Sequence, residues 1–226
     1  IRLPVTLVSV SSLEETIQEL HCMSLCYEKS GLLTELGVVV SRIPLEPNWG
    51  RFLVAAVLMR CLDAGLLICA AVAVGRSPVS VALSEDPLDV KKYHSDHYAI
   101  IVAFNRWQEA RPRFLTHSTE LQFCQQNGLD LQCLRQMERV KNRLLDCLEN
   151  ELRLLSNVAA IYAPNSSDVK HCLNANLEKR SIVRGLLVYA LPKTIAIGHG
   201  LPPLRSLQTK DSVLLISDSS ACSMAE

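Results

Sequence analysis

The stretch "FLVAAVLMRCLDAGLLICAAVAVG", Phe52 to Gly75, is the most apolar part of this 226-residue chain. Arg60 and Asp63 interrupt it, and the uncharged run that follows them is too short to cross a bilayer. The pattern predicts two buried helices, over about 49–60 and 63–74, joined by a tight turn at 61–63. No membrane span is expected here.

Apolar spacing of three to four residues continues on both sides of this pair. It predicts further helices over about 12–28, 37–43, 95–110, 118–128, 129–155 and 178–191. Gly31 is expected to end the first of them. In the helix over 129–155 an apolar stripe would face the core, and its charged face is more typical of a solvated surface than of a binding surface. The segment 32–37, "LLTELG", is a candidate β-wing, and "KTIAIG" (193–198) and "DSVLLIS" (211–217) have the composition of short strands.

The charges of the chain are balanced. Lysine and arginine together number 23, as do aspartate and glutamate, so a nucleic-acid contact would have to come from a local basic patch. The nine cysteines include no C-x-x-C pair, and an odd number without a disulfide framework indicates a reducing, intracellular compartment. His21, Cys22 and Cys26 form at most half of a metal site, because no second ligand pair of suitable spacing follows. We expect no metal site.

Motifs of catalysis are absent from the sequence. The G-x-x-x-x-G-K-[ST] loop that holds nucleotide phosphates does not occur, so no cofactor is expected in this stretch. Ser95, Asp96 and His97 are the residue types of a hydrolytic triad, but neighbours at a helix start point about 100° apart and cannot align as nucleophile, base and orienting acid. We predict that Ser95 caps the helix over 95–110 and that Asp96 meets the positive end of its dipole. The role of His97 stays open between packing, capping and contact with a partner.

An ordered series of short motifs runs along the chain. The N-terminal part matches a G-x-L-T-x-L-G wing, an L-P-x-x-P turn, and a G-[RK]-x-L element leading to C-L, at Gly31, Leu33, Thr34, Leu36, Gly37, Ile43, Pro44, Leu45, Glu46, Pro47, Gly50, Arg51, Leu53, Cys61 and Leu62. The later part matches an S-D-H helix that ends in tryptophan, an F-C-x-x-N-x-L element, a V-R-x-A-L helix and an H-P-S-S strand, at Ser95, Asp96, His97, Trp107, Phe123, Cys124, Asn127, Leu129, Val183, Arg184, Leu187, Leu191, Pro192, Ser219 and Ser220. In this order the motifs resemble the region that follows the two motor domains of DEAH/RHA-type RNA helicases.

The resemblance implies a mainly α fold in three parts. Residues 1–47 would be a winged-helix remnant, residues 48–156 a helical ratchet bundle, and residues 157–226 a linker helix and the onset of a small β unit of the OB type. In the family these parts close a channel over single-stranded RNA and pack against the motor domains, which carry ATP and Mg²⁺. They also receive activator proteins with glycine-rich patches. The implied function is an accessory part of an ATP-dependent RNA helicase, in the nucleus, the cytoplasm or a mitochondrion.

Cationic residues at helix ends and loops are the candidate RNA contacts, because each is able to neutralise a phosphate. With His97 they are Arg51, Lys91, Lys92, Arg106, Arg111 and Arg113. The chain also departs from the family: the piece before S-D-H is shorter, and Ser217 and Asp218 replace the H-P of H-P-S-S. These departures and the neutral charge support an alternative, a helicase-like scaffold in a ribonucleoprotein assembly without ATPase activity.

Overall fold

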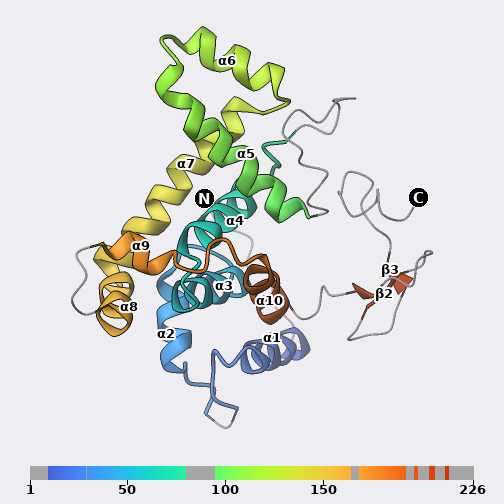
Figure 1. Cartoon of the computed structure of the whole chain (residues 1–226). Helices are drawn as coiled ribbons and strands as arrows, with labels where there is room; N and C mark the ends of the chain where they lie inside the picture. The colour runs from blue at the N-terminus through green and yellow to red at the C-terminus, as the bar shows by residue number, and fades with distance from the viewer. Residues whose placement is uncertain are drawn as a thin grey trace, which may run out of the picture.

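The computed structural model describes residues 10–28, 30–79, 95–163 and 168–191, together with the backbone of three short strands. The helices are α1 (Val10–Cys22), α2 (Glu35–Arg42), α3 (Pro47–Leu58), α4 (Leu62–Val74), α5 (Asp96–Ala110), α6 (His117–Gln126), α7 (Leu131–Asp146), α8 (Leu154–Tyr162), α9 (Val169–Leu173) and α10 (Arg180–Ala190). A 3₁₀ turn, η2 (Arg111–Arg113), follows α5, and a π turn, η3 (Cys147–Glu151), follows α7. The mainly helical fold is confirmed (Figure 1).

Helix α4 lies at the centre of the bundle. It is buried on nearly every face and contacts α3, α5 and α7. Gly65 allows α3 to approach closely, since a Cβ atom at this position would lie 2.5 Å from the Cβ of Ala56. The two predicted apolar helices therefore exist within about two residues of their expected ends, and they form the middle of the core. None of the described helices is both long and apolar enough to span a bilayer.

The turn between α3 and α4 is held by the segment around α9. Arg60 has a left-handed backbone with φ of 60°, which is uncommon for a residue other than glycine. Its Nε donates to the carbonyl of Cys172 at 2.8 Å, and the Asn176 side chain donates to the carbonyl of Met59 at 2.9 Å. The Asp63 amide donates to Asn174 Oδ1 at 2.8 Å. Because these partners lie more than a hundred positions away in the sequence, the turn ties the C-terminal helices to the bundle.

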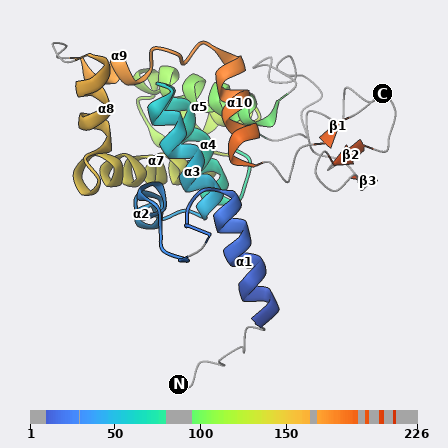
Figure 2. The same cartoon turned by 90° about the horizontal axis from the view of Figure 1, so that it is seen from below.

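The N-terminal part differs from the prediction in two ways. Helix α1 ends at Cys22, where Ser24 adopts a φ of 60°, and Gly31 lies in a later turn. The segment 32–37, expected as a β-wing, is helical from Glu35 onward, and its pairing among the described residues is an isolated bridge between Cys26 and Leu33. The winged-helix assignment remains a prediction. Thr34 caps α2, because its Oγ1 accepts from the Gly37 amide at 3.0 Å and donates to a carbonyl at 2.8 Å. Helix α1 projects away from the other helices (Figure 2).

The long helix predicted over 129–155 is interrupted. Helix α7 ends at Asp146, the π turn η3 follows, and the chain turns at Arg153, whose φ is 51°, before α8 begins. The apolar period continues through the break, since Leu148 is fully buried and Leu155 is 4% exposed. The sequence pattern therefore gave no sign that the direction of the chain changes.

The C-terminal strands β1 (Ala196–Ile197), β2 (Leu204–Ser206) and β3 (Ser212–Val213) form an antiparallel sheet in that order. Strands β1 and β3 lie in the two segments that were predicted as strands, and the OB fold itself remains a prediction. The described residues of all three expected parts contribute to one core, which includes Val40, Val57 and Val183. The division at 47 and 156 also remains a prediction.

We expect the Gly65→Ala substitution to destabilise the chain by about 1–3 kcal/mol, because the added methyl group overpacks the contact between α3 and α4. Gly185→Ala is the matched control: nothing lies within 4 Å of its Cβ position in α10, and alanine should raise stability by about 0.5–1 kcal/mol through helix propensity. Urea unfolding followed by far-UV circular dichroism measures both. Equal effects of the two substitutions would contradict the close approach.

Candidate nucleic-acid interface

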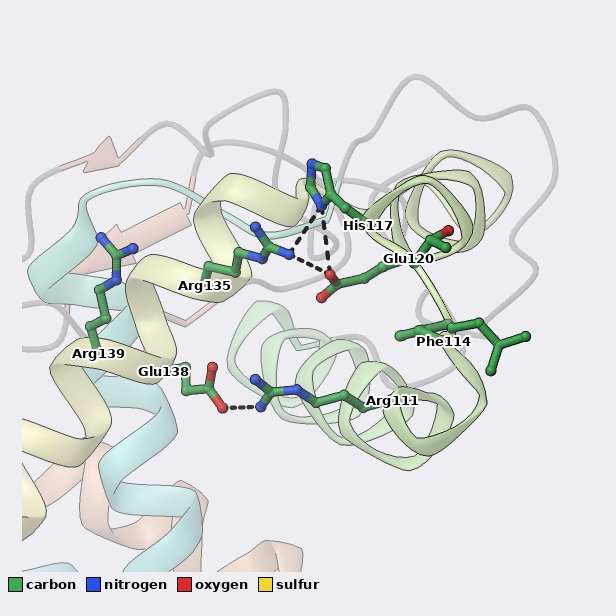
Figure 3. A pocket seen from close by; sticks show the side chains of 9 residues that line it. Arg111, Phe114, His117, Glu120, Arg135, Glu138 and Arg139 are labelled. Atoms are coloured by element: carbon green, nitrogen blue, oxygen red, sulfur yellow. Dashed lines mark hydrogen bonds and ion pairs between the residues drawn. The ribbon is translucent and has the colours of Figure 1, made fainter.

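A groove of about 550 Å³ lies where α5, η2, α6 and α7 meet (Figure 3). The chain turns sharply here, since α5 runs into the 3₁₀ turn η2 and then into α6. The groove is lined by Arg111, Phe114, Leu115, Thr116, His117, Glu120, Arg135, Glu138 and Arg139. Three arginines thus face two carboxylates, which leaves the groove with a positive charge.

Glu120 is the buried anchor of this corner. Only 7% of the residue is exposed, and one carboxylate oxygen accepts from Trp107 Nε1 at 3.0 Å. The other oxygen is paired with the guanidinium of Arg135. His117 lies beside this pair, with Nδ1 at 3.1 Å from a guanidinium nitrogen of Arg135. A single carboxylate therefore connects α6 to both α5 and α7.

Arg111 and Glu138 form a second connection across the groove. Their side chains are ion-paired, and Gln108 Nε2 donates to the same glutamate oxygen at 3.1 Å. The Arg111 guanidinium also lies 5.2 Å from the centre of the Trp107 ring, within the range of a cation–π contact. Arg111 is thus held in position by its contacts with Glu138 and Trp107.

Three exposed arginines on the same elements make no ion pair with another described residue: Arg106 on α5, Arg113 on η2 and Arg139 on α7. The close-up shows Arg139 beside the groove with no dashed contact (Figure 3). Arg106, Arg111 and Arg113 were expected from the sequence as cations able to meet phosphate. Arg111 lines the groove, whereas Arg106 on α5 and Arg113 on η2 are exposed on adjoining elements and do not line it. Whether they touch RNA remains a prediction.

Arg135, Arg139 and His117 were not among the predicted residues. The charged face of α7 was interpreted as solvated, and on sequence alone it resembles any such face. The sequence feature that could have identified Arg135 and Arg139 is their spacing of four positions, which places them on the same side of a helix. Their functional meaning depends on α6, which the sequence does not place beside them.

Arg51 has a packing role in the structure, and its contact with RNA remains a prediction. The residue is 8% exposed, and its guanidinium lies 3.7 Å from the centre of the Tyr189 ring. Its Nη1 donates to the carbonyl of the same tyrosine at 3.1 Å. Because these contacts join α3 to α10, we leave Arg51 out of the proposed interface. Lys91 and Lys92 lie outside the described residues.

The S-D-H segment opens α5 without forming a triad. Ser95 occupies the N-cap position with an extended backbone, but its side chain makes no capping hydrogen bond, so that part of the prediction is wrong. Asp96 lies in the first turn, as expected for the positive end of the helix. His97 is partly buried, with its ring centre 6.5 Å from that of Trp49. Of the three open roles for His97, the structure shows packing.

The cysteines of the described part are unpaired, and all except Cys22 are buried. Burial raises the pKa of the Cys124 thiol to about 11 and that of Cys133 to about 11. These thiols therefore remain protonated at neutral pH and act as small apolar side chains.

We expect Glu120→Ala to destabilise the chain by about 2–4 kcal/mol, because it leaves the buried Trp107 N–H without an acceptor and Arg135 without its counter-charge. The control is Glu138→Ala, whose ion pair with Arg111 is more exposed and should contribute about 0–1 kcal/mol. Urea midpoints measure both changes. Similar losses from the two substitutions would contradict the anchoring role of Glu120.

The change of folding stability with pH should depend on His97. Burial lowers its pKa below the ordinary value, and the charge of Asp96 opposes this shift. The folded chain then binds fewer protons than the unfolded chain once the pH falls below the unfolded pKa of about 6.5, so stability decreases as the pH falls. Between about pH 7.5 and about pH 5.5, the wild type should lose more stability than His97→Gln. Urea unfolding at each pH measures the two slopes, and equal slopes for the wild type and His97→Gln would contradict the effect of burial.

Comparisons with known proteins find similarity to ATP-dependent helicases. No protein-family model matches the chain. It is 34% identical to the DExH-box ATP-dependent RNA helicase DExH1 of Arabidopsis thaliana over 52% of the chain, and 26% identical to the ATP-dependent DNA/RNA helicase DHX36 of Homo sapiens over 83% of it. It is 23% identical to the putative pre-mRNA-splicing factor ATP-dependent RNA helicase DHX32 of Xenopus laevis over 72% of the chain.

The matched part is a small share of each relative. It covers 12% of DExH1, 18% of human DHX36 and 22% of DHX32. The resemblance predicted from the ordered motifs is confirmed. The chain is similar in sequence to one segment of DExH/DEAH-type RNA helicases.

Proposed function

We propose that this chain is an accessory part of an ATP-dependent RNA helicase and that the corner of α5, η2, α6 and α7 contacts the backbone of single-stranded RNA. The observation that supports it most is the set of exposed arginines without described acidic partners, Arg106, Arg113 and Arg139, on elements that the Glu120 contacts hold together. An arginine that is not paired with a carboxylate retains its N–H donors for a phosphate.

The groove beside these arginines supplies a shaped surface for the RNA backbone. Arg111 and Arg135 are partly neutralised by Glu138 and Glu120, so their main contribution is a fixed wall. Arg139 lines the same groove from α7. A backbone that passes along the corner would meet cations from different helices, which fits non-sequence-specific binding through phosphates. Lys91 and Lys92 stay in the proposal as cations that precede α5 in the sequence.

The ATP-hydrolysing parts of the proposed helicase would lie on other parts of the protein. The curated relatives are several times longer than this chain, and we propose that motor domains there bind ATP and Mg²⁺ and move the strand that this corner holds. A glycine-rich-patch activator or a ribonucleoprotein assembly would be a further partner. Buried thiols suit the reducing intracellular compartment in which RNA is processed.

The alternative, a scaffold without ATPase activity, makes a different prediction for the full-length protein. An ATPase assay with and without single-stranded RNA separates the two. RNA-stimulated hydrolysis would exclude the scaffold, and its absence in a protein that still binds RNA would favour it.

The RNA interface predicts a specific dependence on salt. For single strands the slope of log affinity against log salt concentration is about 0.7 per neutralised phosphate. The combined substitution of Arg106, Arg113 and Arg139 by alanine should therefore make that slope shallower by about 2. Fluorescence anisotropy with a labelled single-stranded RNA, titrated at several salt concentrations, measures it.

The matched control is the triple substitution of Arg42, Lys170 and Arg184 by alanine. All three are exposed cations, and Arg42 lies at the other end of α7, where its carbonyl is near Cys147 Sγ. The control should keep the wild-type slope. An equal change in both variants would mean that binding is diffuse and would contradict the proposed interface.

A further inference from the structure

Leu115 is the most exposed large apolar side chain of the described residues. It is 92% exposed, although it lines the groove at the junction of η2 and α6. A single exposed leucine is ordinary in itself. Its surroundings are not, because Arg113 precedes it by two residues and His117 follows it by two, which places their Cα atoms within about 7 Å of its own.

The backbone that presents Leu115 is fixed on both sides. Before it, the Phe114 amide donates to the carbonyl of Arg111 at 3.1 Å, and the Phe114 ring lies 5.3 Å from that of Phe123. After it, Thr116 forms a capping box with Thr119, with reciprocal hydrogen bonds of 3.3 and 3.2 Å. The leucine therefore stands on a rigid corner, and its exposure is a feature of the fold.

We infer that Leu115 packs against a base of single-stranded RNA whose phosphates are held by the neighbouring arginines. An apolar side chain beside arginines is complementary to a ligand that carries apolar faces next to negative charges, and each nucleotide of a single strand has both. A purely apolar protein partner would have to desolvate Arg113 and Arg139 without pairing them, which is costly. The inference rests on the proposed function and adds a base contact to it.

A base contact and a phosphate contact differ in their response to salt. Leu115 carries no charge, so Leu115→Ala should weaken binding to single-stranded RNA about three- to tenfold without changing the salt slope. The loss should vanish with double-stranded RNA, whose bases are stacked inside the helix. Leu121→Ala is the matched control, at a leucine of α6 that is 40% exposed and does not line the groove. It should bind like the wild type.

A second variant reports the contact directly. Leu115→Trp places an exposed indole at the corner, in a chain whose Trp107 is fully buried. Its fluorescence should be quenched by single-stranded RNA through stacking, and much less by an RNA of the same length that has abasic sites. Thermal melting of each variant should match the wild type, since the side chain at position 115 is in solvent.

The outcomes separate this inference from the proposed function. If the wild-type chain binds no RNA, or if the arginine triple variant keeps the wild-type slope, both fail. If binding depends on the arginines while Leu115→Ala binds single-stranded RNA like the wild type, the base contact alone is overturned. The base contact is also overturned if Leu115→Ala weakens the binding of double-stranded RNA as much as that of single-stranded RNA. Binding to phosphatidylserine vesicles that requires Leu115, with unchanged RNA binding, would also overturn it and assign the residue to a membrane surface.

Discussion

The close packing of α4 against its neighbours is the constraint on which the rest of the structure depends. A helix that is apolar on every face has to be surrounded, and α4 is surrounded by α3, α5 and α7. Gly65 permits the approach of α3, and the polar contacts of Arg60 and Asn176 fix the turn between them. Because α5 and α7 are both positioned by α4, the corner that they form with α6 inherits its geometry from the core.

At that corner the Glu120 carboxylate holds the helices together, as apolar packing does elsewhere in the bundle. Helix α6 has few buried residues, so contacts with apolar neighbours alone would hold it weakly. Glu120 compensates by accepting a hydrogen bond from Trp107 and pairing with Arg135. At this buried place a donor or charge without a partner would lower the stability of the fold. The same contact that stabilises α6 thereby sets the position of the groove wall.

The sequence predicted what depends on local pattern and missed what depends on distant contacts. The ends of α3 and α4 followed from their apolar runs, and α5 began where the S-D-H segment indicated. Arg51 was predicted as an RNA contact because a cation near a helix start resembles a phosphate ligand, whereas in the structure its guanidinium packs on Tyr189, 138 positions away. The break before α8 was hidden because leucines keep their spacing through the π turn. Glu120 gave no signal, since an acid on a polar helix is usually solvated.

The arginines of the corner fall into two groups with different physical effects. Arg111 and Arg135 are paired with carboxylates, so they add little net field and their geometry does not depend on a ligand. Arg106, Arg113 and Arg139 are exposed and lack such pairs among the described residues, so their charge acts on the solvent side. A chain with balanced total charge can in this way carry a local basic surface, because Glu120 and Glu138 are paired with arginines within the corner. In the proposed function, paired arginines would supply shape and exposed arginines would supply ionic affinity, which is why only the second group should change the salt dependence of binding.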